Sequence, residues 1–255
     1  MKKRFEEKVV IVTGASSGIG RATAIEFARD GAKVVVAARR AEQSEQTVEL
    51  IRDEGGEAVF VHCDVARSDS VQAMVVKTIE TFGGLDCAFN NAGVAGHVLR
   101  PTAEHTEKIW DRVVNTNLKG VWLCMKYEIP EMLNHGGGSI VNTSSFFGLR
   151  GSTFGNTPYA VSKHGVIGLT RTAAVEYARE GIRVNAVCPG WTHSEMTDTG
   201  FDAFPDEMAK RIDDVPMGRA ADAVEIAQAV LWLCSDEAKY VTGQALAPDG
   251  GLMAK

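Results

Sequence analysis

Short runs of β-branched residues alternate with longer segments of helical periodicity along almost the whole chain. The expected strands are KVVIVT at 8–13, KVVVAA at 33–38, AVFVHCDV at 58–65 and LDCAFNNAG at 85–93, and helices are expected over 18–30, 42–54 and 68–82. Strands that alternate with helices predict a parallel sheet with crossover helices. We therefore expect an α/β fold, a doubly wound parallel sheet of about seven strands with helices on both faces.

The same alternation continues through the second half of the chain. We expect helices over 106–132, 158–180 and 222–234, and strands at 139–145, 183–187 and around 243–251. No repeat or linker interrupts the pattern, so residues 1–255 are expected to form one domain. Residues 190–220 are rich in Pro, Gly, Asp and Thr and have weak periodicity, which is typical of a mobile substrate lid.

The segment 68–82 illustrates the helical pattern. Its apolar residues, among them Val71, Met74 and Val75, fall on one stripe that should cover one face of the sheet. Ser68 is the expected N-cap, and Gly83 is expected to end the helix.

Composition narrows the classes of function. The chain carries 27 basic and 33 acidic residues spread along its length, which argues against a nucleic-acid or anionic-membrane surface and favours a small-molecule substrate. Its apolar runs are too short to span a bilayer and no signal-peptide pattern follows the N-terminus, so a cytoplasmic location is expected. The five cysteines lack CxxC spacing and should be reduced core residues, and no histidine falls in a ligand pattern that would predict a metal site.

The stretch VTGASSGIG at 12–20 lies where the first strand should pass into the first helix. In an open parallel sheet, this turn is the usual phosphate-binding position. Glycine lets the backbone approach a pyrophosphate, and the helix N-terminus offers unpaired N–H groups and the positive end of its dipole. The spacing GxxxGxG differs from the common GxGxxG pattern, so a tight structural turn is the alternative interpretation.

Tyr159 and Lys163 are one helical turn apart within the expected helix 158–180, so their side chains should lie on one face. A nearby ammonium group favours the phenolate, and it should lower the tyrosine pKa toward the range in which general acid–base catalysis works. Such pairs also arise by chance on helices, so surface packing is the alternative interpretation of the pair taken alone.

Five motifs together resemble the short-chain dehydrogenases/reductases in order and spacing. They are TGASSGIG at 13–20, NNAG at 90–93, YAVSK at 159–163, PG at 189–190 and DGG at 249–251. The resemblance covers essentially the whole chain. It implies a single-domain Rossmann fold, hydride transfer with a nicotinamide cofactor, and assembly as a homotetramer.

The resemblance implies a catalytic set of Asn117, Ser145, Tyr159 and Lys163. Tyr159 would give or take the proton of the substrate oxygen, Ser145 would hold that oxygen, and Lys163 would also bind the nicotinamide ribose. Asn117 would open its helix locally and hold a water molecule that contacts the lysine. Ser144 is the alternative to Ser145, and Asn115 is the alternative to Asn117.

The resemblance also implies a set of cofactor-binding residues from several segments. They are Gly14, Ser16, Ser17, Gly18, Ile19 and Gly20 in the glycine turn, Arg39 and Arg40, Asp64 and Val65, Asn91 and Ala92, Tyr159 and Lys163, and Pro189, Gly190, Thr192 and Ser194. Among these, Asp64 and Val65 would contact adenine, Asn91 would lie near the cofactor ribose, and Thr192 and Ser194 would contact the nicotinamide carboxamide.

The end of the second strand bears on the choice of cofactor. Ala38 stands where NAD-preferring members of the family carry an acid, and Arg39 follows it. A guanidinium group binds phosphate through charge-assisted hydrogen bonds, so NADP(H) is the expected cofactor, with NAD(H) as the alternative. Solvated charges at a strand end are the alternative interpretation of Arg39 and Arg40. Some NADP-preferring relatives carry a second basic residue in the glycine turn, at the position where this chain has Ser17.

The expected substrate is a ketone or a secondary alcohol in an apolar pocket. The candidate pocket residues are Gly96, His97, Phe147, Leu149, Phe154, Trp191 and Met196, and the three aromatic residues fit equally well as core or lid packing.

Two other functions stay open from the sequence. A 3-oxoacyl-[acyl-carrier-protein] reductase resembles this chain throughout, but such enzymes typically carry basic residues on the carrier-docking surface, where this chain has Gly136 and Glu180. A catalytically silent NADP-sensing scaffold is the alternative from a different class.

Apolar and small residues on the helices 106–132 and 158–180 are expected to pack against a second copy of the chain. They are Trp110, Val113, Val121, Met125, Gly165, Gly168, Ala173 and Ala174.

Overall fold

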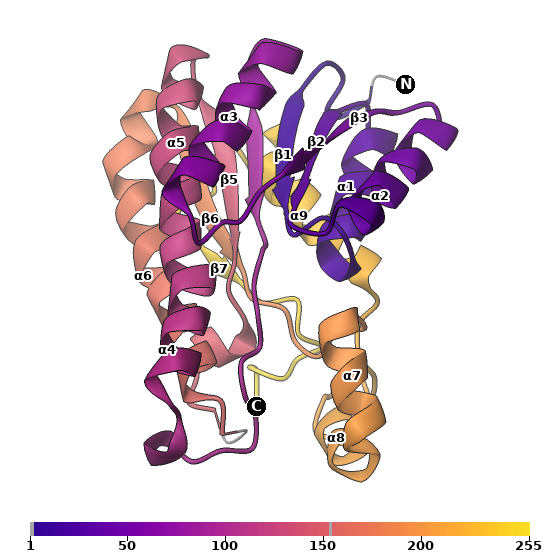
Figure 1. Ribbon diagram of the computed structural model, residues 1–255, viewed down its shortest axis with the longest axis vertical. Coiled ribbons are helices and arrows are strands. Elements are labelled where there is room, and N and C mark those ends of the chain that lie inside the picture. The colour runs from indigo at the N-terminus through magenta and orange to yellow at the C-terminus, as the bar shows by residue number, and fades with distance from the viewer. Residues whose placement is uncertain (1–2, 153–154) are drawn as a thin grey trace.

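Seven parallel strands form one sheet in the order β3-β2-β1-β4-β5-β6-β7 within residues 3–152 and 155–255, which the computed structural model describes (Figure 1). The strands are β1 (Val9–Thr13), β2 (Lys33–Ala38), β3 (Glu57–His62), β4 (Cys87–Asn90), β5 (Gly138–Thr143), β6 (Ile182–Val187) and β7 (Ala245–Leu246). Every neighbouring pair is parallel, so the expected doubly wound sheet is confirmed. The strand order reverses between β1 and β4, and ligands bind at such switch points.

Helices cover both faces of this sheet. They are α1 (Gly18–Arg29), α2 (Ala41–Asp53), α3 (Ser68–Phe82), α4 (Glu107–Val114), α5 (Gly120–Asn134), α6 (Thr157–Tyr177), α7 (Glu195–Ala203), α8 (Pro205–Asp213) and α9 (Ala223–Cys234). Helices α1, α2 and α9 pack on one face, and α3, α5 and α6 pack on the other (Figure 1).

Successive strand residues point to opposite faces, and both faces are covered, which is why Val9–Val12 of β1 form an unbroken apolar run. In β1, Val10 and Val12 join the core that contains Phe27 of α1. Ile11, between them, joins the second core with Met74 of α3. All five cysteines are buried and free, as expected.

The expected helix over 106–132 is interrupted. Thr106 caps α4 by accepting a hydrogen bond from the backbone N–H of Ile109, but α4 ends at Val114. Residues Asn115–Lys119 then form a π-helical turn before α5 begins at Gly120. The local opening of the helix around Asn117, which the family resemblance implies, is therefore confirmed.

Other boundaries differ from the prediction. Ser68 is not the N-cap of α3, because Arg67 holds that position and the Ser68 hydroxyl lies 2.7 Å from the Tyr127 hydroxyl. Gly83 does end the helix, in the left-handed conformation. The helix expected to reach Glu180 ends at Tyr177 and is followed by a 3-10 turn, and the last strand has two residues.

Residues 190–220 contain more regular structure than their weak periodicity predicts, because they hold α7 and α8. Helix α8 begins with Phe204 as N-cap and a proline in its first turn, and it buries Met208. Asp206 and Glu207 in its first turn and Lys210 and Arg211 in its last complement the helix dipole. These two helices project beyond the carboxyl ends of the strands (Figure 1).

The expected contact surface for a second copy is partly wrong. Val113, Val121, Met125, Ala173 and Ala174 are buried in the chain itself. All but Val113 belong to the core beneath the sheet face that α3, α5 and α6 cover. Periodicity places these residues on an apolar face, but that face packs on the sheet of the same chain. Trp110 and Gly168 are exposed and Gly165 is half-buried, so they remain available for an intermolecular contact.

In the described part of the chain, no helix combines the length and the apolar composition that crossing a bilayer requires.

Candidate active site

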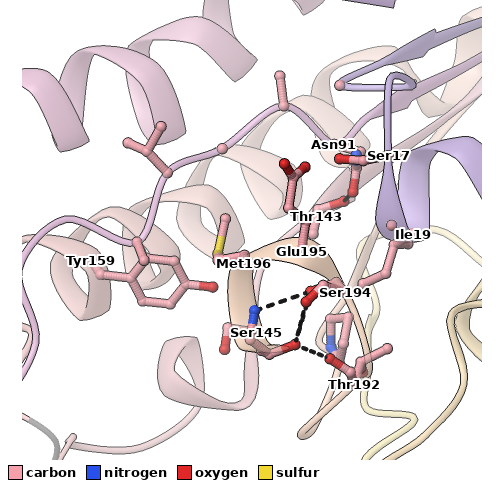
Figure 2. A pocket seen from close by; sticks show the side chains of 18 of the residues that line it. Ser17, Ile19, Asn91, Thr143, Ser145, Tyr159, Thr192, Ser194, Glu195 and Met196 are labelled. Carbon is pink, nitrogen blue, oxygen red and sulfur yellow. Dashed lines mark hydrogen bonds between the residues drawn. The ribbon is translucent and has the colours of Figure 1, made fainter. Parts of the chain in front are cut away.

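A cavity of about 710 Å³ lies beyond the carboxyl ends of the strands. Its walls come from the turn after β1, the segments that follow β2 to β5, and helices α6, α7 and α8. This volume falls within the range of small-molecule and cofactor sites. In Figure 2, Tyr159 and Ser145 lie on the wall, and Met196 lies between Tyr159 and the side chains of Ser17 and Asn91.

The glycine turn shapes one end of this cavity. Gly14 and Gly18 have positive φ angles of 67° and 51°, which favour glycine. A Cβ at Gly14 would lie 2.9 Å from the Cα of Ala92, and one at Gly20 would overlap the carbonyl oxygen of Gly14. Gly14, Ser16, Ser17, Gly18 and Ile19 line the cavity, whereas Gly20 does not and serves close packing of the turn.

The start of α1 is suited to bind an anion. Ser17 is its N-cap residue, but the Ser17 side chain makes no capping hydrogen bond. Ser17 therefore leaves the first N–H groups of the helix uncapped, and Gly18 and Ile19 line the cavity. Free N–H groups and the positive dipole end together fit a dinucleotide phosphate.

Asn91 and Ala92 line the cavity beneath this turn. The Asn91 side chain donates to the carbonyl oxygen of Thr13 over 3.1 Å and accepts from the Thr143 hydroxyl over 3.4 Å. Asn91 thus ties the ends of β1, β4 and β5 together. Asp64 and Val65 also line the cavity, and the Asp64 carboxylate accepts from the N–H of Ala66 over 3.1 Å.

The two arginines after β2 differ in their surroundings. Both line the cavity, and Arg39 is exposed with no hydrogen bond to another described side chain. Arg40 donates to the Ser17 hydroxyl over 2.8 Å, to the Ser16 hydroxyl over 3.1 Å and to the Glu195 carboxylate over 2.7 Å. The solvated-charge interpretation therefore does not describe Arg40.

Tyr159 and Lys163 lie on one face of α6 and both line the cavity. The Lys163 Nζ lies 5.5 Å from the centroid of the Tyr159 ring and donates to the carbonyl oxygen of Thr143 over 2.7 Å. The strand end at β5 therefore fixes the ammonium group beside the phenol. Surface packing does not explain this pair.

The expected lowering of the Tyr159 pKa by Lys163 is wrong for this structure. Burial raises the pKa of Tyr159 above its ordinary value, while the nearby Ser145 hydroxyl acts in the opposite direction. Burial also lowers the pKa of Lys163 to about 8. The ammonium lies over the ring rather than at the phenol oxygen, so loss of hydration dominates.

The two candidate serines have different environments. The Ser144 hydroxyl donates to the backbone carbonyl of Lys163 over 2.8 Å, so it is committed to holding α6. The Ser145 hydroxyl accepts from the N–H of Phe147 over 3.2 Å and keeps its own proton for another partner. This geometry favours Ser145 as the residue that meets the substrate.

The two candidate asparagines also differ. Asn115 is exposed, whereas Asn117 is fully buried. The Asn117 side chain accepts from the N–H of Val94 over 2.8 Å and donates to the carbonyl oxygen of Val94 over 2.9 Å. Both of its polar ends thus hold the loop after β4, and the residue does not itself line the cavity.

The segment after β6 contributes Pro189, Gly190, Thr192 and Ser194 to the cavity wall. A Cβ at Gly190 would lie 2.7 Å from the Cα of Asp249, so the PG and DGG motifs pack directly on each other. The Asp249 carboxylate accepts from the N–H groups of Gly251 and Met253 over 2.9 and 2.8 Å and closes this C-terminal turn.

Four of the expected pocket residues, Gly96, Phe147, Trp191 and Met196, line the cavity. His97 and Leu149 do not, and Phe154 lies outside the described residues. Phe147 and Trp191 pack edge to face with ring centroids 6.1 Å apart. They belong to a small apolar cluster with Met208 of α8, so they serve both as core and as pocket wall.

Among the cavity residues that sequence reasoning missed are two polar ones, Asn156 and Glu195. Asn156 is the N-cap of α6, a position that favours asparagine, but its side chain makes no capping bond, and its Oδ1 has no hydrogen-bond partner among the described residues. Its position shortly before YAVSK in the sequence could have identified it as a site residue. Nothing in the local sequence indicates that Glu195 meets Arg40.

The model of the family described as enoyl-(acyl carrier protein) reductase matches residues 14–253. The chain belongs to the short-chain dehydrogenases/reductases. It is 45% identical over 246 residues to an A-factor type gamma-butyrolactone 1'-reductase (1S-forming) of Streptomyces virginiae, covering 96% of this chain and 95% of the relative. A 3-oxoacyl-[acyl-carrier-protein] reductase of Staphylococcus aureus is 41% identical, covering 96% of this chain and 98% of the relative.

Among solved structures, levodione reductase superposes on this short-chain dehydrogenase/reductase with a TM-score of 0.94 and 39% identity, covering 98% of this chain and 99% of the other. The fold expectation is therefore confirmed at the level of the whole chain. The chain is an oxidoreductase of this family that acts on carbonyl or alcohol groups with a nicotinamide cofactor. A catalytically silent scaffold is accordingly not its function.

Proposed function

We propose that this short-chain dehydrogenase/reductase is an NADP(H)-dependent enzyme that interconverts a ketone and a secondary alcohol. One observation supports this most strongly. Tyr159, Ser145 and Lys163 line the same cavity as the glycine turn, so a proton donor, an oxygen-binding hydroxyl and an anion-binding helix end share one space.

The cofactor supplies the hydride, and the residues of this chain manage the substrate oxygen and its proton. The Ser145 hydroxyl donates to the substrate oxygen and holds it near Tyr159. The raised pKa keeps the Tyr159 phenol protonated at neutral pH, so it is ready to donate when the oxygen gains negative charge during reduction. Lys163, held by Thr143, would bind the nicotinamide ribose and hold positive charge beside the phenol.

The preference for NADP(H) rests on the end of β2. Ala38 offers no carboxylate to the ribose 2'-hydroxyl, and Arg39 and Arg40 line the cavity. Arg40 and the hydroxyl of Ser17 form a donor set suited to a 2'-phosphate. A chemically neutral 2'-hydroxyl would not use the positive charge in this way.

The substrate end of the cavity is mainly apolar. Phe147, Trp191, Met196, Phe204 and Met208 contribute to its wall. The relatives' names describe reductases of a gamma-butyrolactone, of levodione and of 3-oxoacyl groups. The proposed substrate is therefore a ketone whose carbon skeleton is largely apolar.

The test is a panel of ketones and secondary alcohols with NADPH, NADH and their oxidised forms, followed by absorbance of the reduced nicotinamide. Tyr159→Phe should lower kcat about 10²–10⁴-fold, because the proton donor is lost. Tyr127→Phe, which changes a tyrosine that bonds Ser68 away from the cavity, is the matched control. Full activity of a folded Tyr159→Phe protein contradicts the mechanism, and higher rates with NADH throughout contradict the cofactor preference.

Reduction of a 3-oxoacyl group on acyl carrier protein is the second candidate, favoured by the relative of that name. Gly136 and Glu180 offer no positive charge to an acidic carrier, and the net charge of −6 also disfavours docking. Turnover of a 3-oxoacyl carrier protein at a higher kcat/KM than the free thioester would favour this candidate.

Homotetramer assembly and a cytoplasmic location also remain proposals. Trp110, Trp122, Val161 and Val175 expose apolar surface on α4, α5 and α6. Exposed apolar residues on neighbouring helices are typical of subunit interfaces.

A further inference from the structure

An ion pair crosses the cavity from the end of β2 to the start of α7. The Arg40 Nη1 and the Glu195 Oε1 are 2.7 Å apart, although the two residues are 155 positions apart in the chain. Arg40, and secondarily the Ser17 hydroxyl, holds the pKa of Glu195 at about 2, so the carboxylate is ionised. In Figure 2, Glu195 lies on the side of the pocket where Ser17 and Asn91 lie.

The donors at this place are those that a phosphate group requires. The guanidinium group of Arg40 also bonds the hydroxyls of Ser16 and Ser17, next to the N-terminus of α1. Guanidinium and hydroxyl groups bind carboxylate and phosphate oxygens with the same geometry. The Glu195 carboxylate therefore occupies hydrogen-bond donors that an anionic ligand bound at the glycine turn would use.

A second contact is independent of charge. A Cβ at Gly18 would lie 3.0 Å from the Cβ of Ser194, so the residue before α7 touches the glycine turn. The start of α7 thus meets the glycine turn through Ser194 on Gly18 and the end of β2 through Glu195 on Arg40. An anion that takes the Nη1 donor of Arg40 must therefore separate Arg40 from Glu195.

We propose that Glu195 is a specificity-determining residue for the cofactor, in which its carboxylate competes with a 2'-phosphate for Arg40. This inference rests on the proposed use of NADP(H). When the nucleotide carries a 2'-phosphate, the phosphate displaces Glu195 and frees the start of α7. When it carries only a 2'-hydroxyl, Glu195 keeps Arg40 neutralised, and the nucleotide binds without facing an unpaired cation.

The size of the effect follows from exposure. The side chains of Arg40 and Glu195 are 42% and 58% exposed, and ion pairs this accessible to water contribute little. Removing the Glu195 carboxylate should therefore tighten binding of a 2'-phosphate by about two- to fivefold. This is the change in affinity that corresponds to the usual strength of an exposed ion pair.

The test compares adenosine 2',5'-bisphosphate with adenosine 5'-monophosphate, two probes that differ only in the 2'-phosphate, by titration calorimetry. Glu195→Gln should bind the bisphosphate about two- to fivefold more tightly and the monophosphate unchanged. Asp198→Asn is the matched control, since it removes one negative charge from the same helix, where the carboxylate contacts His193 rather than Arg40. In an Arg40→Ala background, Glu195→Gln should change neither affinity.

The result that overturns the proposal is an equal change, or no change, for both probes on Glu195→Gln. Failure of the proposed cofactor preference would look different, because the unmodified protein would then bind the two probes equally. If the natural protein binds both probes equally but Glu195→Gln prefers the bisphosphate, the competition for Arg40 is supported. The proposed NADP(H) preference of the natural chain is then contradicted.

Discussion

Glu128 is a carboxylic acid in the interior of the molecule, on α5. The Asn90 side chain donates to the Glu128 Oε2 over 3.0 Å, whereas the Glu128 Oε1 has no partner within residues 3–152 and 155–255. Burial raises the pKa of Glu128 from 4.5 to about 7. The protonated form therefore stabilises the fold fully below about pH 4.5, and this contribution is lost as the pH rises through about 7.

Glu128→Gln should increase the free energy of unfolding at pH 8 by about 1–3 kcal/mol, because the amide cannot ionise. At pH 5 the gain should be much smaller, since the natural residue is then neutral. Urea unfolding at the two pH values measures the difference, and Glu131→Gln on the same helix is the control. Parallel stability curves for Glu128→Gln and the natural protein would show that Glu128 does not titrate in this range.

At the scale of elements, the π-helical turn between α4 and α5 gives Asn117 its role. The extra width of the turn places the Asn117 side chain against the backbone of Val94, where it replaces the hydrogen bonds that a neighbouring strand would supply. The loop that follows β4 and lines the cavity is held in this way. Asn117 thus acts on the site through a loop.

Asn117→Ala should lower the free energy of unfolding by about 1–3 kcal/mol, because a donor and an acceptor of Val94 lose their partner. Asn117→Asp should lower the free energy of unfolding at least as much at neutral pH, because it places a buried carboxylate against the carbonyl oxygen of Val94. Asn115→Ala, in the same turn but exposed, should have an effect within about 0.5 kcal/mol. Equal losses at the two positions, measured by urea unfolding, would contradict the role assigned to Asn117.

The helix pattern in the sequence was sufficient for most elements but not for those around the site. The segment 68–82 forms α3 and ends at Gly83 as predicted, although its N-cap is Arg67 rather than Ser68, because its apolar stripe packs on the sheet. Helix α8 was missed although Phe204, a proline and two acids at its start formed a recognisable signal. Helix α7 packs on α8 and the cavity rather than on the sheet, so no long apolar stripe marks it in the sequence.

In the whole molecule, helices α5 and α6 each expose an apolar residue to solvent, and these two residues are candidates for the proposed tetramer interface. Val175 on α6 is 83% exposed and Trp122 on α5 is 46% exposed, which is costly for a monomer in water. Leu50 on α2 is exposed to a similar degree as Trp122, but it lies over the opposite face of the sheet. The effects of substituting an exposed apolar residue on each of the two faces can therefore be compared within one chain.

Val175→Glu combined with Trp122→Glu should reduce the mass in solution from four copies toward two or one, because burying two carboxylates in an interface is costly. Leu50→Glu should leave the mass unchanged. Size-exclusion chromatography with light scattering measures both. A tetramer that survives the double change would place the interface elsewhere, and a monomeric natural protein would contradict the assembly itself.

The amino-acid sequence was sufficient for the alternation of strands with the helices that cover the sheet, for the glycine turn and for the spacing of Tyr159 and Lys163, because each depends on residues close together in the chain. The tertiary structure decided what depends on distant neighbours. It distinguished Ser145 from Ser144 by a bond to α6, and Asn117 from Asn115 by burial. It also raised the Tyr159 pKa and brought Glu195 to Arg40, since desolvation and charge pairing arise only when remote segments pack together.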